Sequence, residues 1–221
     1  MKPLHGIRAV LFDLDGTLID SESLTDRAVL DLLQSHSITS DGLDLIQFHG
    51  LSWQGIDAQL RALFPILEQV NHLADTLAAR CAQLAQRQPP PFIPGAQRAF
   101  LAASDLLPTA IVTGSNAATV EDVLQRADLQ NACSFYVSSE HYTGSKPDPA
   151  CYQLAADRLG LAPDTCLVFE DSMPGLHAAR SAGMQAIAVT HSTSAPPSGL
   201  AAGCITDYTE LADDFFAQIS V

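Results

Sequence analysis

Short apolar runs alternate with segments of helical periodicity along most of this chain. The first run covers residues 7–12, and runs of strand length recur at 109–113, 135–138, 166–169, 185–189 and 204–205. Apolar residues at helical spacing lie between them, at 96–103, 116–127, 148–159, 174–182 and 209–218. Such alternation is typical of a parallel sheet that helices cover on both faces, with right-handed crossovers. The pattern therefore predicts an α/β fold.

Residues 20–91 interrupt this alternation. Helical spacing of apolar residues predicts helices over 21–36, around 52–64 and around 70–87, and the segment contains no convincing strand. Three consecutive prolines at 89–91 end it. A proline run cannot continue a helix and is stiff, which suits a hinge. We therefore predict an all-helical domain at 20–91, inserted into a core that consists of residues 1–19 and 92–221.

Composition restricts the partners that we expect. The net charge is −14, with only 11 Lys and Arg, so nucleic acid and anionic membranes would be repelled. No apolar run is long enough to span a bilayer, and the first strand begins too early to leave room for a signal peptide. The five cysteines form no CxxC pair, which indicates neither a disulfide framework nor a zinc site. We expect a cytoplasmic protein, a monomer or weak dimer, without nucleic-acid or membrane partners.

Acidic side chains follow two of the predicted strands. Asp13 and Asp15 come directly after the first strand, and Glu170 and Asp171 come directly after the strand at 166–169. In an open α/β sheet, ligands bind in the crevice beyond the carboxyl ends of the strands. If the two strands are neighbours, four carboxylates meet there, and their pKa values would rise unless a cation were present. Hard oxygen ligands that leave room for water and phosphate oxygens favour Mg²⁺.

Two further features stand where predicted strands end. Thr113-Gly114-Ser115-Asn116 places hydroxyl groups and backbone amides at a helix N-terminus, an arrangement that binds anions. Lys146 is one of only two lysines in the chain. Beside a bound phosphate it would balance charge and hold a nucleophilic carboxylate. Each feature alone is also compatible with an ordinary surface loop, but their joint occurrence at strand ends favours a catalytic site.

These motifs resemble those of the haloacid dehalogenase superfamily, in the subgroup with a helical cap. The similar segments are residues 12–22, 112–116, 144–149 and 169–184, which occur in the family's order. The subgroup contains β-phosphoglucomutase, phosphoglycolate phosphatase and sugar-phosphate phosphatases. The resemblance spans essentially the whole chain and implies a doubly wound Rossmann-like core with a cap that closes over the substrate.

The resemblance also implies roles for individual residues. Asp13 would be the nucleophile that carries an aspartyl-phosphate, and Asp15 would protonate the leaving oxygen and later take a proton from water. Lys146 would bridge nucleophile and phosphate, while Thr113 and the amide of Gly114 would bind a phosphoryl oxygen. Dehalogenases of the family lack the second Asp, so its presence here favours phosphoryl transfer. The implied Mg²⁺ ligands are the carboxylates of Asp13, Glu170 and Asp171 and the backbone carbonyl of Asp15.

The helical insert offers further candidates for substrate contact, namely Glu22, His49, Ser52, Trp53 and Gln54. It departs from β-phosphoglucomutase at two positions. Thr25 stands where that enzyme has a cap histidine, and Trp53 stands where it has an arginine that clamps the second phosphate. The insert also contains no lysine, which excludes a Schiff-base mechanism of the phosphonoacetaldehyde hydrolase kind. Without the arginine clamp, a bisphosphate intermediate would be poorly held.

We therefore expect a magnesium-dependent phosphatase that acts on a small phosphorylated metabolite. A sugar or polyol phosphate suits the insert, because Glu22 can bond hydroxyl groups and Trp53 can stack on a sugar ring. A phosphosugar mutase of the β-phosphoglucomutase kind and a phosphoglycolate phosphatase are the alternatives. A non-catalytic binding module is a more remote one, against which the presence of both Asp13 and Asp15 argues.

Overall fold

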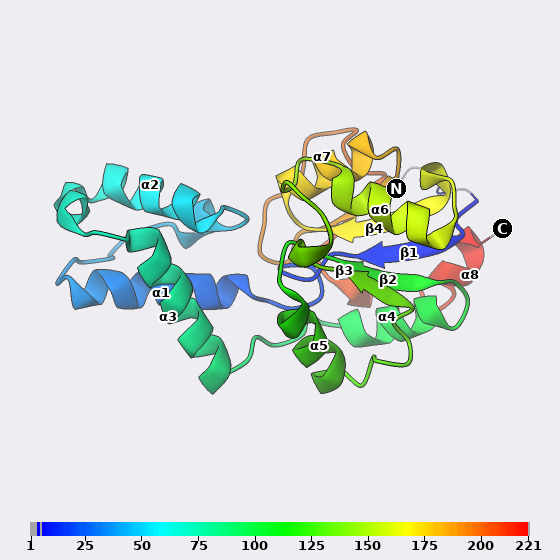
Figure 1. Cartoon of the computed structure of the whole chain (residues 1–221), viewed down its shortest axis with the longest axis horizontal. Coiled ribbons are helices and arrows are strands. Elements are labelled where there is room, and N and C mark those ends of the chain that lie inside the picture. Colours follow the sequence, from blue (N-terminus) through cyan, green and yellow to red (C-terminus); the bar gives the residue numbers. More distant parts are fainter. Residues whose placement is uncertain (1–3, 5, 221) are drawn as a thin grey trace. The chain divides into compact units, whose positions relative to one another are not determined.

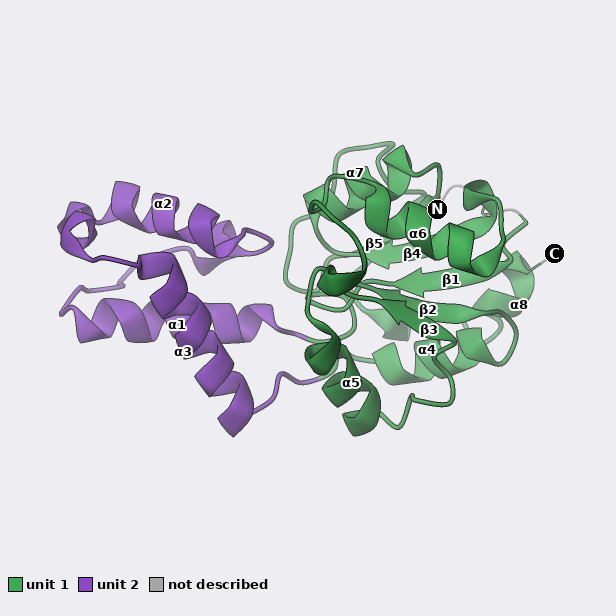
Figure 2. Ribbon diagram, viewed as in Figure 1, with its two compact units in different colours: residues 1–19, 92–221 green, residues 20–91 purple. Residues whose placement is uncertain are grey.

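The computed structural model describes residues 4 and 6–220. The chain divides into two compact units, which Figure 2 distinguishes by colour. Unit 1 consists of residues 1–19 and 92–221, and unit 2 consists of residues 20–91. Each unit has its own buried apolar core.

A six-stranded sheet forms the centre of unit 1 (Figure 1). Its strand order is β3-β2-β1-β4-β5-β6, and every neighbouring pair is parallel. The order reverses at β1, which is the topology of a doubly wound sheet. The predicted α/β fold is therefore confirmed. The strands are β1 (Ala9–Phe12), β2 (Thr109–Val112), β3 (Phe135–Val137), β4 (Cys166–Glu170), β5 (Gln185–Val189) and β6 (Gly203–Ile205).

Helices cover both faces of the sheet (Figure 1). Side chains alternate along each strand, so Val10 and Phe12 of β1 enter one apolar cluster while Ala9 and Leu11 enter the other. The first cluster includes residues of α4 (Ala96–Ser104), α5 (Ala117–Arg126) and α8 (Phe215–Ile219). The second includes residues of α6 (Ala150–Leu159) and α7 (Met173–Ser181). Burial on both faces explains why β1 is apolar throughout and why β2 and β4 each contain a single polar or charged residue.

The register of the central strands brings three strand ends to one level. Phe12 at the end of β1 pairs with Phe169 of β4 on one side and with Ile111 of β2 on the other. The residues that follow these strands therefore emerge at the same edge of the sheet. This edge is where the sequence places its acidic and hydroxyl motifs.

The helix predicted over residues 209–218 is wrong in its first half. The structure has a 3₁₀ turn at Tyr208–Glu210 and an α-helix only at Phe215–Ile219. The Asp207 carboxylate accepts a hydrogen bond from the backbone N–H of Thr209 at 2.9 Å and caps the short turn. Asp213 and Asp214 then form a second turn before the helix begins. Aspartate bonds nearby backbone groups and disfavours a helix interior, which explains the break.

Unit 2 contains only helices among its regular elements. Its α-helices are α1 (Glu22–Ser35), α2 (Trp53–Leu63) and α3 (Leu73–Arg87), and its 3₁₀ helices are Leu45–Phe48 and Pro65–Gln69. Their apolar faces bury Leu32, Phe48, Ile56, Leu60 and Leu77 in one cluster. In the described part of the chain, no helix has both the length and the apolar character needed to cross a membrane.

Candidate active site

Strand β1 delivers Asp13 to the carboxyl edge of the sheet. Its backbone N–H donates to the carbonyl of Phe169 at 3.0 Å, which continues the pairing of β1 with β4, and the residue is only 6% exposed. The chain then turns tightly through Gly16, whose φ is +72°. A Cβ atom on Gly16 would lie 2.2 Å from Oδ2 of Asp171. Glycine is therefore required here both for the backbone conformation and for the close approach of Asp171.

Strand β4 brings Glu170 and Asp171 beside Asp13. One ligand oxygen from each of these three carboxylates lies within 4.8 Å of the others, and all three residues are buried. The hydroxyl of Thr17 donates to Oδ1 of Asp171 at 3.2 Å, which ties the turn after β1 to the end of β4. Three of the four acids that the sequence placed at two strand ends therefore form one cluster. The carboxylate of the fourth, Asp15, bonds the Ser115 hydroxyl instead.

Lys146 lies between two of these carboxylates. Its Nζ atom donates to Oδ1 of Asp13 and to Oε1 of Glu170, each at 2.5 Å, and to the carbonyl of Val112 at 3.4 Å. The side chain is 12% exposed, so these bonds form largely away from bulk water. Charge-assisted bonds of this kind fix the ammonium group directly beside the Asp13 carboxylate.

Electrostatics at this cluster favours a bound cation. Burial raises the pKa of Asp13 to about 8; Lys146 opposes the rise, while Glu170 and Asp15 add to it. Burial by itself would lower the pKa of Lys146, but Asp13 and Glu170 hold that pKa well above its usual range. One ammonium group therefore faces more negative charge than it can balance. Clustered, buried carboxylate oxygens are the donor set that suits Mg²⁺.

The loop after β2 places hydroxyl groups beside the acids. Thr113 is 1% exposed, and its backbone N–H donates to the carbonyl of Val137 at 2.9 Å. Its Oγ1 accepts a hydrogen bond from the N–H of Ser115 at 3.0 Å, which tightens the loop around Gly114. The Ser115 hydroxyl donates to Oδ2 of Asp15 at 2.5 Å. Asn116 caps α5 by accepting from the N–H of Thr119 at 2.9 Å.

Comparison with known proteins identifies the family of this chain. The family model for haloacid dehalogenase-like hydrolases matches residues 7–183. The chain belongs to this family. The resemblance of the four motifs is thereby confirmed, and each of the four supplies a residue to the cluster described above.

Two curated relatives of this haloacid dehalogenase-like (HAD-like) hydrolase are named as sugar or polyol phosphatases. Hexitol phosphatase B of Escherichia coli K12 is 30% identical over 204 residues, which cover 86% of each chain. Fructose-1-phosphate phosphatase of the same organism is 31% identical over 183 residues, covering 81% of this chain and 95% of the relative. A HAD family hydrolase of Deinococcus radiodurans R1, solved with bound phosphate and sodium, superposes with a TM-score of 0.76 at 27% identity. That match covers 97% of this chain and 98% of the other.

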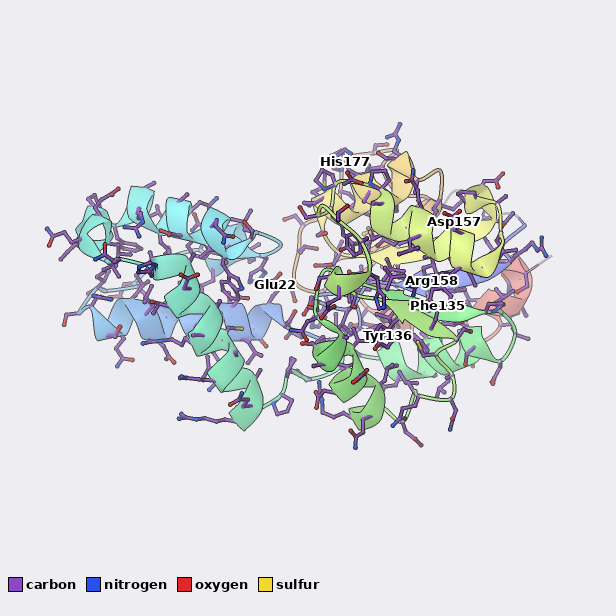
Figure 3. The ribbon with its side chains drawn as sticks, in the orientation of Figure 1. Glu22, Phe135, Tyr136, Asp157, Arg158 and His177 are labelled. Carbon is purple, nitrogen blue, oxygen red and sulfur yellow. The ribbon has the colours of Figure 1, made fainter. Side chains whose placement is uncertain are left out.

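The candidates in unit 2 have partners within that unit. Glu22, labelled in Figure 3, lies in the first turn of α1, and its Oε1 accepts from the N–H of Gly50 at 2.8 Å. Nε2 of His49 lies 2.9 Å from Oδ1 of Asp26. Ser52 caps α2, and Trp53 packs against the apolar cluster of the unit. These contacts organise the loop before α2, and direct contact of the four residues with substrate stays a prediction.

Reasoning from the sequence overlooked several residues that support the HAD-like site. The Tyr152 hydroxyl donates to Oε1 of Glu170 at 3.2 Å, and Ser172 donates to Oε2 through both its N–H and its hydroxyl at 3.0 Å. A Cβ atom on Gly175 would lie 1.7 Å from Oε1 of Glu170, so only glycine fits there. For Ser172 a signal existed, since Ser before Pro174 is typical of a helix start. For Tyr152, helical periodicity shows burial but not the partner of the hydroxyl.

Proposed function

We propose that this chain is a magnesium-dependent phosphatase that hydrolyses a small phosphorylated sugar or polyol through an aspartyl-phosphate on Asp13. The observation that carries the proposal is the position of Lys146, which bonds Asp13 and Glu170 at the edge of the sheet where Asp171 and Thr113 also emerge. This arrangement provides a nucleophile, a cation beside it and hydroxyl and amide donors for phosphate oxygens.

In the first step, a carboxylate oxygen of Asp13 attacks the phosphorus atom. The bond from Asp13 to phosphorus forms as the bond from phosphorus to the substrate oxygen breaks. Asp15 donates a proton to that oxygen, so the sugar or polyol leaves as a neutral alcohol. Lys146 and the hydroxyl of Thr113 stabilise the charge of the transferring group.

In the second step, Asp15 works in the opposite direction. It takes a proton from a water molecule, which attacks phosphorus and releases inorganic phosphate from Asp13. The Ser115 hydroxyl, which donates to Oδ2 of Asp15, holds this carboxyl group in one orientation for both steps. The cycle returns Asp13 as a carboxylate and Asp15 as an acid.

The residues present fit a magnesium ion. Asp13, Glu170 and Asp171 offer oxygen atoms within 4.8 Å of one another, and the negative charge of this buried cluster exceeds the positive charge of Lys146. The backbone carbonyl of Asp15 completes the set that the family resemblance implies. Bound Mg²⁺ supplies Lewis-acid stabilisation of phosphoryl oxygens.

The substrate class rests on the named relatives and on unit 2. Two relatives are named for hexitol and fructose-1-phosphate, and Trp53 stands where a mutase would need an arginine clamp for a second phosphate. These observations favour hydrolysis of a monophosphate over a mutase reaction. The scattered cysteines, with no CxxC pair among them, suit the reducing cytoplasm, and the proposal includes residence there.

The experiment is a screen of purified protein for release of inorganic phosphate from sugar phosphates, polyol phosphates and phosphoglycolate, with Mg²⁺ and with a chelator. We expect Mg²⁺-dependent release from at least one sugar or polyol phosphate and none from Asp13→Asn. Isomerisation of a sugar phosphate without phosphate release would favour the mutase. Turnover that survives Asp13→Asn or complete chelation would refute the proposal.

A further inference from the structure

Glu170 is fixed by donors on both of its oxygens. Oε1 accepts from Nζ of Lys146 at 2.5 Å and from the Tyr152 hydroxyl at 3.2 Å. Oε2 accepts from the N–H and the hydroxyl of Ser172, both at 3.0 Å. Because donors bond both oxygens, these contacts specify one orientation of the carboxylate group. Glu170 is fully buried, and water does not compete for these bonds.

Tyr152 reaches this carboxylate from the first turn of α6. The residue is fully buried, and its ring centroid lies 5.0 Å from Nζ of Lys146. The ring therefore faces the ammonium group while the hydroxyl bonds the acid that the same ammonium contacts. An aromatic ring at this distance attracts a cation, and a tyrosine hydroxyl adds a directed donor that phenylalanine lacks.

The ammonium group of Lys146 is shared between two competing carboxylates. Asp13 and Glu170 both accept from Nζ at 2.5 Å. The Tyr152 hydroxyl, as a second donor to Oε1 of Glu170, partly stabilises its negative charge. Glu170 therefore attracts the ammonium group of Lys146 less strongly. In a buried site this effect is large, because hydrogen bonds there are electrostatically stronger than in water.

We propose that Tyr152 is a positioning residue for phosphoryl transfer, because its hydroxyl restrains Glu170 and thereby keeps Lys146 directed at Asp13. The role in catalysis rests on the proposed function. The positioning of Lys146 does not, since it is a property of the folded chain without substrate. Tyr152 itself does not touch the reacting atoms and acts through Glu170.

The test compares two buried tyrosines. Tyr152→Phe removes the hydroxyl that bonds Glu170 and keeps the ring over Lys146. The matched control is Tyr208→Phe, because Tyr208 is also fully buried and its hydroxyl has no hydrogen-bond partner among the described residues. With p-nitrophenyl phosphate and saturating Mg²⁺, we expect kcat to fall about tenfold in Tyr152→Phe, as for loss of one hydrogen bond to a charged group. The control should match the wild-type protein.

A spectroscopic measurement follows the lysine directly. The chain has only Lys2 and Lys146, so protein labelled with ¹³Cε-lysine gives two side-chain signals, which Lys146→Met assigns. We expect the Lys146 signal to move in metal-free Tyr152→Phe and to stay in place in Tyr208→Phe. An unmoved signal in Tyr152→Phe, or a kcat equal to that of the control, would overturn the inference.

A double-mutant cycle with Glu170→Gln tests whether Tyr152 acts through Glu170. In the Glu170→Gln background, Tyr152→Phe should lower kcat no further. An undiminished tenfold loss there would overturn the inference. If Tyr152→Phe does not fold, Glu170→Gln alone must move the Lys146 signal, and an unmoved signal would overturn it. Absence of turnover in the wild-type protein would instead refute the proposed function, which keeps the two failures distinct.

Discussion

Replacement of the nucleophile by its amide should stabilise the metal-free protein. Asp13 is buried with Glu170 and Asp15 nearby, and these surroundings raise its pKa from 3.8 to about 8 despite the contact with Lys146. Asp13→Asn removes one negative charge, and Lys146 keeps Glu170 as its partner. A gain in stability on loss of a catalytic group is expected where an active site holds charges that the fold alone does not favour.

The pKa shift gives the size and the pH dependence of this effect. A change of one in pKa corresponds to about 1.36 kcal/mol, so the change from 3.8 to about 8 sets a ceiling of about 6 kcal/mol. Local relaxation and a high effective dielectric reduce this, and we expect about 2 to 3 kcal/mol at pH 8. Because the folded-state pKa is raised, the folded wild-type protein binds its proton more tightly than the unfolded chain. The contribution of the Asp13 carboxyl group to the free energy of unfolding is therefore complete below about pH 4 and is lost as the pH rises toward 8.

The assay is urea unfolding of wild type and Asp13→Asn at pH 5 and pH 8, with a chelator and with saturating Mg²⁺. Asp13→Asn should be more stable at pH 8 with the chelator, and the difference should shrink at pH 5. It should shrink or reverse with Mg²⁺, because the wild-type site binds the ion more tightly. The control is Asp213→Asn, since that side chain is 96% exposed and its replacement should change stability little. A metal-free Asp13→Asn protein that is less stable than wild type at pH 8 would show that the metal-free site does not hold excess negative charge.

Three further predictions concern neighbouring residues. Ser115→Ala removes the donor to Asp15 and should lower kcat about tenfold for a sugar phosphate. The loss should be smaller for p-nitrophenyl phosphate, because its leaving group needs no proton. Equal losses for both substrates would contradict the role of Ser115. Gly16→Ala should destabilise the protein by more than about 1 to 3 kcal/mol in thermal unfolding, because a clash with Asp171 adds to the strain of a positive φ. The control Gly42→Ala measures the strain alone, since Gly42 has a φ of +76° and no atom within 4 Å of an added Cβ. An equal effect of both substitutions would show that the clash with Asp171 contributes nothing. Tyr208→Phe removes a buried hydroxyl without a described partner and should raise stability by about 1 kcal/mol or more in urea unfolding, whereas a loss would show that the hydroxyl is bonded.

The strand ends were predictable because two independent patterns coincide there. Buried strands of a parallel sheet are mostly apolar, so the first polar residues after Phe12, Val112 and Phe169 lie at or directly after the strand ends. All parallel strands end at one edge, which is why motifs distant in sequence meet in space. The family match then confirmed the resemblance that these motifs indicate.

Other features depend on contacts that periodicity does not encode. The apolar residues at 209–218 have helical spacing, but Asp207 caps a short turn and Asp213 and Asp214 interrupt the helix. The spacing of α6 shows that Tyr152 is buried, but its bond to Glu170 depends on how α6 packs against β4. In unit 2, His49 is a candidate for substrate contact in the sequence, and the structure pairs its ring with Asp26 of α1.

Trapping of the covalent intermediate tests the central claim most directly. The wild-type protein is mixed with a hydrolysable sugar phosphate and Mg²⁺, quenched with acid within one turnover and digested, and its peptides are examined by mass spectrometry. The account predicts one phosphoryl group on the peptide that contains Asp13, located at that residue by fragmentation and absent from Asp13→Asn. Single-turnover phosphate release with no phosphorylated peptide, or with the phosphoryl group on Asp15, Glu170 or Asp171, would contradict it.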